Sequence, residues 1–139
     1  MVQIISGQKG KGKTKFLLDK VNASVNEAHG SIVYLDKSAK HMYELSNRVR
    51  LINVSEYPIT SFDGFLGLIC GIISQDHDLE QMYFDSFLKI AHVEGKRLTD
   101  SILQIDDISK KFGVDFILSI STDKDDLEDE IKPYVIISL

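Results

Sequence analysis

The segment Gly7-Gln8-Lys9-Gly10-Lys11-Gly12-Lys13-Thr14 constrains the fold of this chain more than any other stretch of its sequence. It follows the pattern G-x-x-x-x-G-K-T, in which glycines let the backbone curl so that successive N–H groups point at one phosphate. The run Val2–Ser6 before it is rich in β-branched residues and typical of a short buried strand. Apolar residues at helical spacing follow Lys13. The sequence therefore predicts a strand, a phosphate-binding loop and a helix, in that order.

The chemistry of this segment is that of a nucleotide site. Lys13 would reach the β- and γ-phosphates as a point charge, and the Thr14 hydroxyl would ligate Mg²⁺. The helix that follows would present its free N–H groups and positive dipole end to the same anion. The predicted nucleotide-binding residues are Gly7, Gln8, Lys9, Gly10, Lys11, Gly12, Lys13, Thr14 and Lys15.

Apolar runs alternate with amphipathic stretches along the rest of the chain. Strands are predicted at residues 31–36, 51–54, 79–85, 114–121 and 134–138, and helices at 13–27, 38–47, from 61 or 63 to 74, from 96 or 99 to 112, and at 123–131. This alternation is typical of an α/β fold with a doubly wound, mostly parallel sheet and helices on both faces. The strand ends should gather the loop, Asp36, Asp85 and Ser121 at one edge of the sheet, where ligands bind in such folds.

In its strand-loop-helix context, the glycine-rich segment resembles the P-loop nucleoside-triphosphatase superfamily. The motif covers residues 7–14 only. The number and order of the other predicted elements are similar to those of RecA-like ATPases, so we expect a small single-domain member of that branch over residues 1–139. The resemblance implies ATP and Mg²⁺ as ligands.

A second carboxylate at a strand end is required to hold Mg²⁺ in such a site. Asp85 and Asp36 each follow an apolar run. We favour Asp85 as the metal-holding and catalytic carboxylate beside Lys13 and Thr14, because the resemblance places that strand after a separate strand-helix excursion. Asp36 could instead start the next helix or touch bound nucleotide.

The hydrolytic half of the motif set is incomplete in this sequence. The resemblance implies a glutamate near Asp85 that orients the attacking water, and only Glu80 and Glu94 are close in sequence. It also implies a polar sensor of the γ-phosphate, for which Ser121 or Thr122 qualifies, although Thr122 could equally cap a helix.

The arginines are Arg48, Arg50 and Arg97, and none lies in a recognisable arginine-finger context. The histidines have no metal-ligand spacing, which argues against a zinc site.

Composition restricts where the chain works and what it binds. It has 139 residues, is 43% apolar and carries a net charge of −5, which argues against nucleic acid or an anionic membrane as its main partner. No apolar run is long enough to span a membrane, and the start Met1-Val2-Gln3 lacks the basic region of a signal peptide. The lone Cys70 excludes an intrachain disulfide and fits a reducing cytoplasm. Because it lies in an apolar run, we expect it to be buried.

Several glycines have predicted roles as well. Gly30 should cap the preceding helix in a left-handed conformation. Gly64, Gly67 and Gly71 recur at intervals of three and four residues, which predicts a close-packing helix face.

These observations predict an ATP·Mg²⁺-binding protein that is a slow or partner-activated ATPase. A protein partner or a neighbouring copy of the chain would then supply the missing group. One alternative is a non-hydrolysing nucleotide-binding module of a larger complex. Another is a small-molecule kinase, although no arginine-rich lid is visible. A GTPase is the weakest reading because the chain lacks an N-K-x-D segment.

Overall fold

All six strands of the chain form one parallel sheet in the computed structural model, which describes residues 1–139. Their order across the sheet is β3-β2-β4-β5-β1-β6, and every neighbouring pair is parallel. The strands are β1 (Val2–Ser6), β2 (Ser31–Asp36), β3 (Val49–Asn53), β4 (Leu79–Phe84), β5 (Asp115–Ile120) and β6 (Val135–Ser138). The predicted parallel sheet is therefore confirmed, with each strand within about two residues of its expected position.

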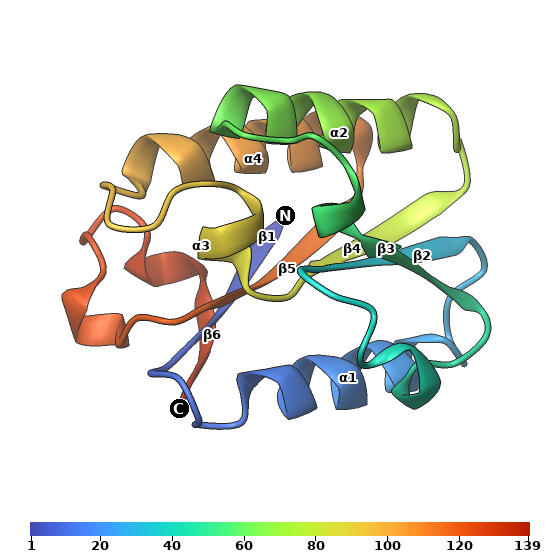
Figure 1. The fold of residues 1–139 in the computed structure, drawn as a ribbon, viewed down its shortest axis with the longest axis horizontal. Coiled ribbons are helices and arrows are strands. Elements are labelled where there is room, and N and C mark those ends of the chain that lie inside the picture. The colour runs from blue at the N-terminus through green and yellow to red at the C-terminus, as the bar shows by residue number, and fades with distance from the viewer.

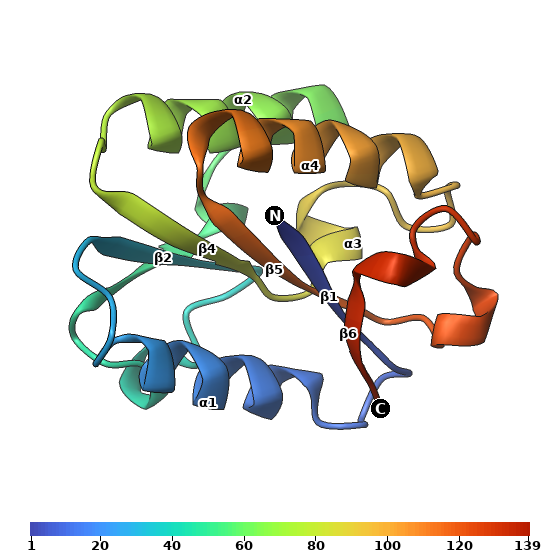
Figure 2. The same ribbon diagram turned by 180° about the vertical axis from the view of Figure 1, so that it is seen from behind.

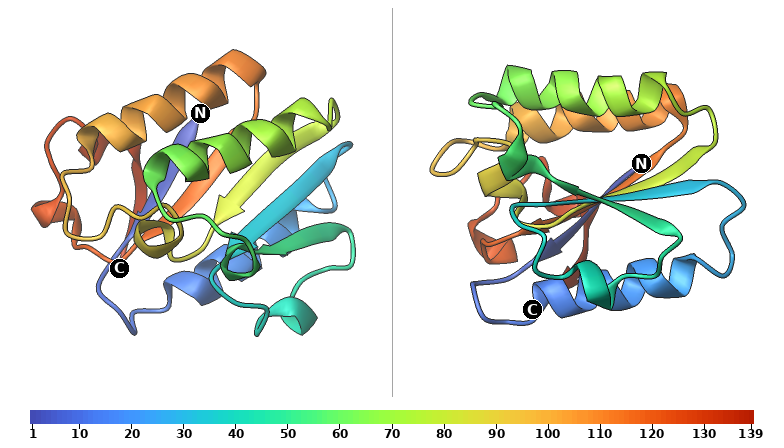
Figure 3. Two further views of the ribbon diagram at one scale, coloured as in Figure 1. Left: turned by 45° about the horizontal axis from the view of Figure 1, so that its top comes forward. Right: turned by 45° about the vertical axis from the view of Figure 1, so that its right-hand side comes forward.

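Helices cover both faces of this sheet, as expected for a doubly wound fold. The α-helices are α1 (Lys13–Ser24), α2 (Phe62–Ser74), α3 (Phe87–Ile90) and α4 (Thr99–Phe112), and the short 3₁₀ turns are η1 (Met42–Glu44), η2 (Val54–Glu56), η3 (Lys124–Asp126) and η4 (Lys132–Tyr134). Figures 1 and 2 show α1 on one face, with α2 and α4 on the other. The two further views in Figure 3 show the same arrangement, with α2 and α4 on one side of the sheet and α1 on the other.

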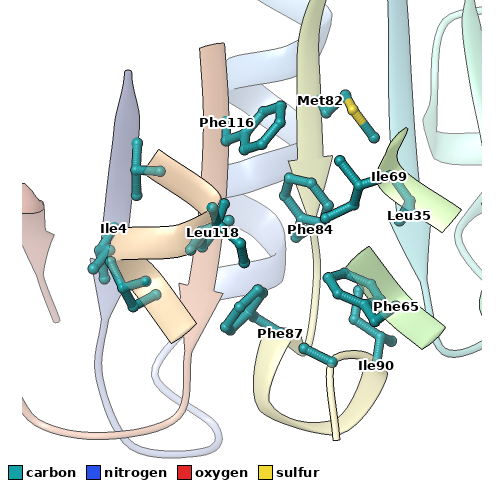
Figure 4. Packing of buried hydrophobic residues seen from close by; sticks show 14 of the residues in the cluster. Ile4, Leu35, Phe65, Ile69, Met82, Phe84, Phe87, Ile90, Phe116 and Leu118 are labelled. Atoms are coloured by element: carbon teal, nitrogen blue, oxygen red, sulfur yellow. The ribbon is translucent and has the colours of Figure 1, made fainter. Parts of the chain in front are cut away.

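The alternation of side chains along the strands divides the core into two parts. The larger part contains 25 buried residues and lies between the sheet and helices α2, α3 and α4. Its centre is aromatic: the Phe84 ring meets the rings of Phe65, Phe87 and Phe116 edge to face (Figure 4). The smaller part contains 10 buried residues between the sheet and α1. Both faces of the central strands are therefore buried, which explains their nearly continuous apolar sequences.

The strand order decides which carboxylates meet the phosphate-binding loop. Strand β5 lies between β1, which leads into that loop, and β4, which leads to Asp85. Strand β2 borders β4 on its other side, so Asp36, the last residue of β2, and Asp85, directly after β4, lie at the ends of neighbouring strands. The carboxyl ends of β2, β4, β5 and β1 therefore bring the predicted site residues to one edge of the sheet.

Two predicted helices are wrong. The segment predicted as helix 38–47 contains only the short turn η1. The Asn22 side chain takes up backbone groups that a helix would pair internally: its amide donates to Glu44 O at 2.8 Å and accepts from Ser46 N at 2.9 Å. The segment predicted as helix 123–131 contains only η3, and the buried side chains of Leu127 and Ile131 hold it against the core instead.

Three predictions about small residues are also wrong. A Cβ atom on Gly30 would lie 1.9 Å from Asp78 O, so this glycine permits a close approach of two backbones and is not a left-handed cap. On α2, Gly67 and Gly71 have no atom within 4 Å of their Cβ positions, so they form no close-packing face. Cys70 is exposed on the same solvent-facing side. The reason is that α2 buries only the stripe containing Phe65, Ile69, Ile72 and Ile73.

No helix of the structure combines the length and the hydropathy needed to cross a membrane.

Candidate nucleotide-binding site

The loop between β1 and α1 exposes a run of free backbone donors. Gly10 and Gly12 adopt left-handed conformations, with φ of 81° and 91°, which side chains with a Cβ rarely tolerate. No main-chain carbonyl accepts a hydrogen bond from the N–H groups of residues 8–15. The loop is anchored at its start, where Gly7 N donates to Thr122 O at 3.0 Å. Such an array of unpaired N–H groups at a helix N-terminus is suited to bind an anion.

Lys13 lies inside this loop. Its side chain is largely buried, the residue keeping 8% of its exposure, and its Nζ donates to Gln8 O at 2.9 Å. Burial lowers the Lys13 pKa, the charge of Asp85 opposes that change, and nearby Lys9 adds to it. The loop therefore holds the ammonium group in a position where a bound anion would favour its charged form and oppose the effect of burial on its pKa.

The remaining loop side chains lie further out. Lys9 lines a cleft that opens beside the loop, whereas the exposed Lys11 does not. Gln8 donates to Asp123 at 3.1 Å, so it ties the loop to the segment after β5. Lys15 forms an ion pair with Asp19 at 2.9 Å on the outer face of α1.

Asp85 is the point where the elements of the site converge. It follows β4 and keeps only 3% of its exposure. Its Oδ1 accepts from Thr14 Oγ1 at 3.2 Å and from Ser119 Oγ at 3.1 Å. Its Oδ2 accepts from Tyr34 OH at 2.9 Å. The structure thus brings Thr14 and Asp85 together, the pair that the sequence assigns to Mg²⁺.

Tyr34 is a further residue of the candidate site that was not predicted from the sequence. Its ring stacks on Tyr83 with 6.1 Å between centroids. Burial raises its pKa strongly, and the neighbouring charge of Asp85 adds to the effect. The phenol therefore stays protonated and acts as a fixed donor to Asp85. Its sequence position at the end of an apolar strand resembles that of an ordinary core tyrosine, so no local signal distinguishes it.

Asp36 is buried beside Asp85, with 2% of its exposure left. One of its carboxylate oxygens accepts from Lys37 N at 2.6 Å, and the other has no hydrogen-bond partner. Burial raises the pKa of Asp36, and the charge of Asp85 raises it further. One ligand atom each of Asp36, His41 and Asp85 lies within 4.8 Å of the other two. The sequence did not reveal this grouping because His41 belongs to a segment that was predicted to be helical.

A cleft of about 790 Å³ opens beside these residues. Five lysines line it, contributed by the loop, by the segment after β2 and by α3: Lys9, Lys13, Lys37, Lys40 and Lys89. Only two acidic residues, Asp85 and Glu94, line the same cleft. A chain with a net charge of −5 therefore concentrates positive charge where the free backbone donors lie.

Two groups considered for catalysis lie elsewhere. Glu80 is at the start of β4, roughly 16 Å from Asp85 at the usual rise per residue, and accepts from Gly30 N at 2.8 Å. None of the three arginines lines the cleft. Arg48 donates to Val25 O at 2.9 Å, and Arg97 pairs with Glu130 at 3.3 Å.

The polar residue of β5 that contacts Asp85 is Ser119. Its hydroxyl donates to Asp85 and accepts from Ser86 N at 2.9 Å. Ser121 and Thr122 line the cleft, but neither makes this contact. Thr122 does not cap η3 either, because Asp123 precedes that turn. Ser119 could have been found as the only polar residue within the apolar run of residues 116–120.

The strand order, the helices on both faces and the site at the carboxyl edge define a RecA-like α/β fold, which confirms the predicted fold class. Among solved structures, a KaiC-like protein from the hyperthermophilic archaeon Pyrococcus horikoshii OT3 is similar, with a TM-score of 0.70 and 17% sequence identity. The similarity covers 98% of this chain and 71% of that chain. No protein-family model matches the sequence, and no curated protein matches it. The similarity establishes the fold.

Proposed function

We propose that this chain binds ATP·Mg²⁺ in the cleft between the β1–α1 loop and α3. The observation that carries the proposal is the convergence of three features in that one cleft. These are the unpaired N–H groups of residues 8–15, the buried ammonium of Lys13 and the contact between Thr14 and Asp85. A RecA-like fold supports this assignment, because open parallel sheets bind ligands at this edge.

The residues present suit a bound magnesium ion. Thr14 Oγ1 and Asp85 Oδ1 lie 3.2 Å apart, and Asp85 forms no ion pair although it is buried. A buried carboxylate without a cationic partner is costly, and a metal ion removes that cost. Thr14 and Asp85 would hold the ion, which neutralises charge on the β- and γ-phosphates when bound.

We further propose that ATP turnover by the isolated chain is slow. Glu94 is the only exposed carboxylate that lines the cleft, and no arginine lines it. The same absence of arginine favours a second candidate function, a nucleotide-binding module that does not hydrolyse ATP. The lone exposed Cys70 suits a reducing compartment, and we place the chain in the cytoplasm on that ground.

The Lys13→Ala variant tests nucleotide binding. The change removes the charge that would contact the β- and γ-phosphates, so the affinity for ATP·Mg²⁺ should fall at least tenfold, or about 1.4 kcal/mol. Isothermal titration calorimetry measures the affinity, and circular dichroism verifies folding. Lys20→Ala, on the same helix but outside the cleft, is the matched control and should bind like the unmodified protein. Unchanged affinity in a folded Lys13→Ala variant would overturn the proposal.

A further inference from the structure

Two buried carboxylates, Asp36 and Asp85, lie close to each other, and neither forms an ion pair. They keep 2% and 3% of their exposure. Lys13, Lys37 and Lys40 line the adjoining cleft, but none of them forms an ion pair with either carboxylate. Buried charges in proteins are normally paired or bound to a metal, because the loss of hydration is otherwise uncompensated.

The two carboxylates differ in how their oxygens are satisfied. Asp85 accepts hydrogen bonds from three hydroxyl groups, on Thr14, Ser119 and Tyr34. Asp36 accepts one, from Lys37 N, and its second oxygen has no partner although it is fully buried. The unsatisfied oxygen of Asp36 is therefore the feature that the nucleotide site leaves unexplained.

His41 completes a set of three ligands. One nitrogen of its ring, one oxygen of Asp36 and one oxygen of Asp85 all lie within 4.8 Å of one another. The ring is held in place, since its Nδ1 lies 2.7 Å from Glu44 Oε2 and the side chain is only 21% exposed. Metal-binding histidines commonly have such a carboxylate partner, which fixes the orientation of the ring.

We propose that Asp36, His41 and Asp85 bind a second divalent cation, of the transition-metal class represented by Mn²⁺. Two carboxylates and a neutral imidazole carry a charge of −2, which a divalent ion balances. An imidazole ligand favours a transition metal over Mg²⁺, which prefers oxygen ligands alone. This ion is distinct from the Mg²⁺ proposed for Thr14 and Asp85, although both sites use Asp85. Because all three ligands come from the chain itself, the second site requires no nucleotide.

Titration of the nucleotide-free protein with Mn²⁺ tests this site. The electron paramagnetic resonance signal of free Mn²⁺ reports how much ion is bound. One ion should bind per chain, and Mg²⁺ should compete at least tenfold more weakly. His41→Ala should weaken Mn²⁺ binding at least tenfold, and His41→Gln serves as a second variant that preserves more of the side-chain volume. His92→Ala alters an exposed histidine outside the cluster and should have no effect.

Two further variants separate this proposal from nucleotide binding. Lys13→Ala should lose ATP affinity but keep its Mn²⁺ affinity, because Lys13 is not a ligand of the second ion. Asp36→Asn should lose Mn²⁺ affinity but keep the loop that binds ATP. The metal proposal is overturned if the nucleotide-free protein binds no Mn²⁺, or if folded His41 variants bind it as tightly as the unmodified protein. Loss of ATP binding in Lys13→Ala is unaffected by either result.

Discussion

Single residues of this chain show how similarly buried carboxylates have their pKa values shifted in opposite directions. Asp36 has an oxygen without a donor, and burial raises its pKa. Asp106, at the far end of the sheet, is equally buried but accepts from Val2 N, Tyr134 OH and Lys110 Nζ. Burial opposes the charge of Asp106 too, but these three contacts outweigh it and hold its pKa below the usual range. Hydrogen bonds to the charged form decide the difference.

The contacts of Asp106 predict a pH-dependent contribution to stability. Because its pKa is lower in the folded chain, the contribution is complete above the unfolded pKa of about 3.9 and disappears as the pH falls through the folded value. Asp106→Asn should therefore reduce the free energy of unfolding at pH 7 by about 1–3 kcal/mol. The difference from the unmodified protein should shrink as the pH falls below about 4.

Urea denaturation at several pH values measures this effect. The matched control is Asp107→Asn, which alters the exposed neighbouring carboxylate on the same helix and should change stability little at any pH. An equal destabilisation of Asp106→Asn at pH 7 and in acid would show that shape, and not charge, is responsible.

At the scale of elements, helix α2 carries an intrinsic weakness. Gly67 lies on its solvent-facing side with free space around the Cβ position. Glycine in a helix interior is less favourable than alanine because the unfolded backbone has more freedom to lose. Gly67→Ala should therefore raise the free energy of unfolding by about 0.5–1 kcal/mol.

Thermal and urea denaturation measure the change, with Gly113→Ala as the contrasting variant. Gly113 ends α4 with a left-handed φ of 66°, so alanine there should destabilise by about 1–2 kcal/mol. If Gly67→Ala destabilised the protein as well, an unrecognised contact on the exposed face of α2 would be indicated.

Elements with strong local signals were predicted well from the sequence. The strand before Gly7, the helix after Gly12 and the strand before Asp85 each depend on a continuous pattern. The predicted helix 38–47 does not form because Asn22, on α1, supplies hydrogen bonds that a helix would have made internally. The predicted burial of Cys70 is wrong because an apolar run in sequence does not reveal which side of a helix faces the sheet.

The missed site residues have a different cause. Tyr34 and Ser119 contact Asp85 across 51 and 34 residues of sequence. His41 reaches the same place only because β2 borders β4. These meetings depend on the order of strands in the sheet, which periodicity does not specify. The sequence thus predicted the two ends of the Thr14–Asp85 contact but not the side chains that surround it.

At the scale of the whole molecule, positive side chains are concentrated at one edge of the sheet. The chain is acidic overall, yet five lysines line the cleft. Positive charge concentrated in a cleft raises the local concentration of an anionic ligand and its rate of association. No arginine, in contrast, lines the cleft: Arg48 donates to the backbone at Val25, and Arg97 forms an ion pair with Glu130.

This distribution predicts the rate of ATP turnover. The absence of an arginine that neutralises the transferred phosphate typically costs a factor of 10³–10⁵ in rate. The isolated chain should therefore bind ATP·Mg²⁺ and hydrolyse it well below about 1 s⁻¹. A phosphate-release assay at low and high protein concentration measures this rate. If turnover per chain rises with concentration, a neighbouring copy supplies the missing group. Fast turnover that is independent of concentration would instead show that the cleft lysines or Glu94 complete the site within one chain.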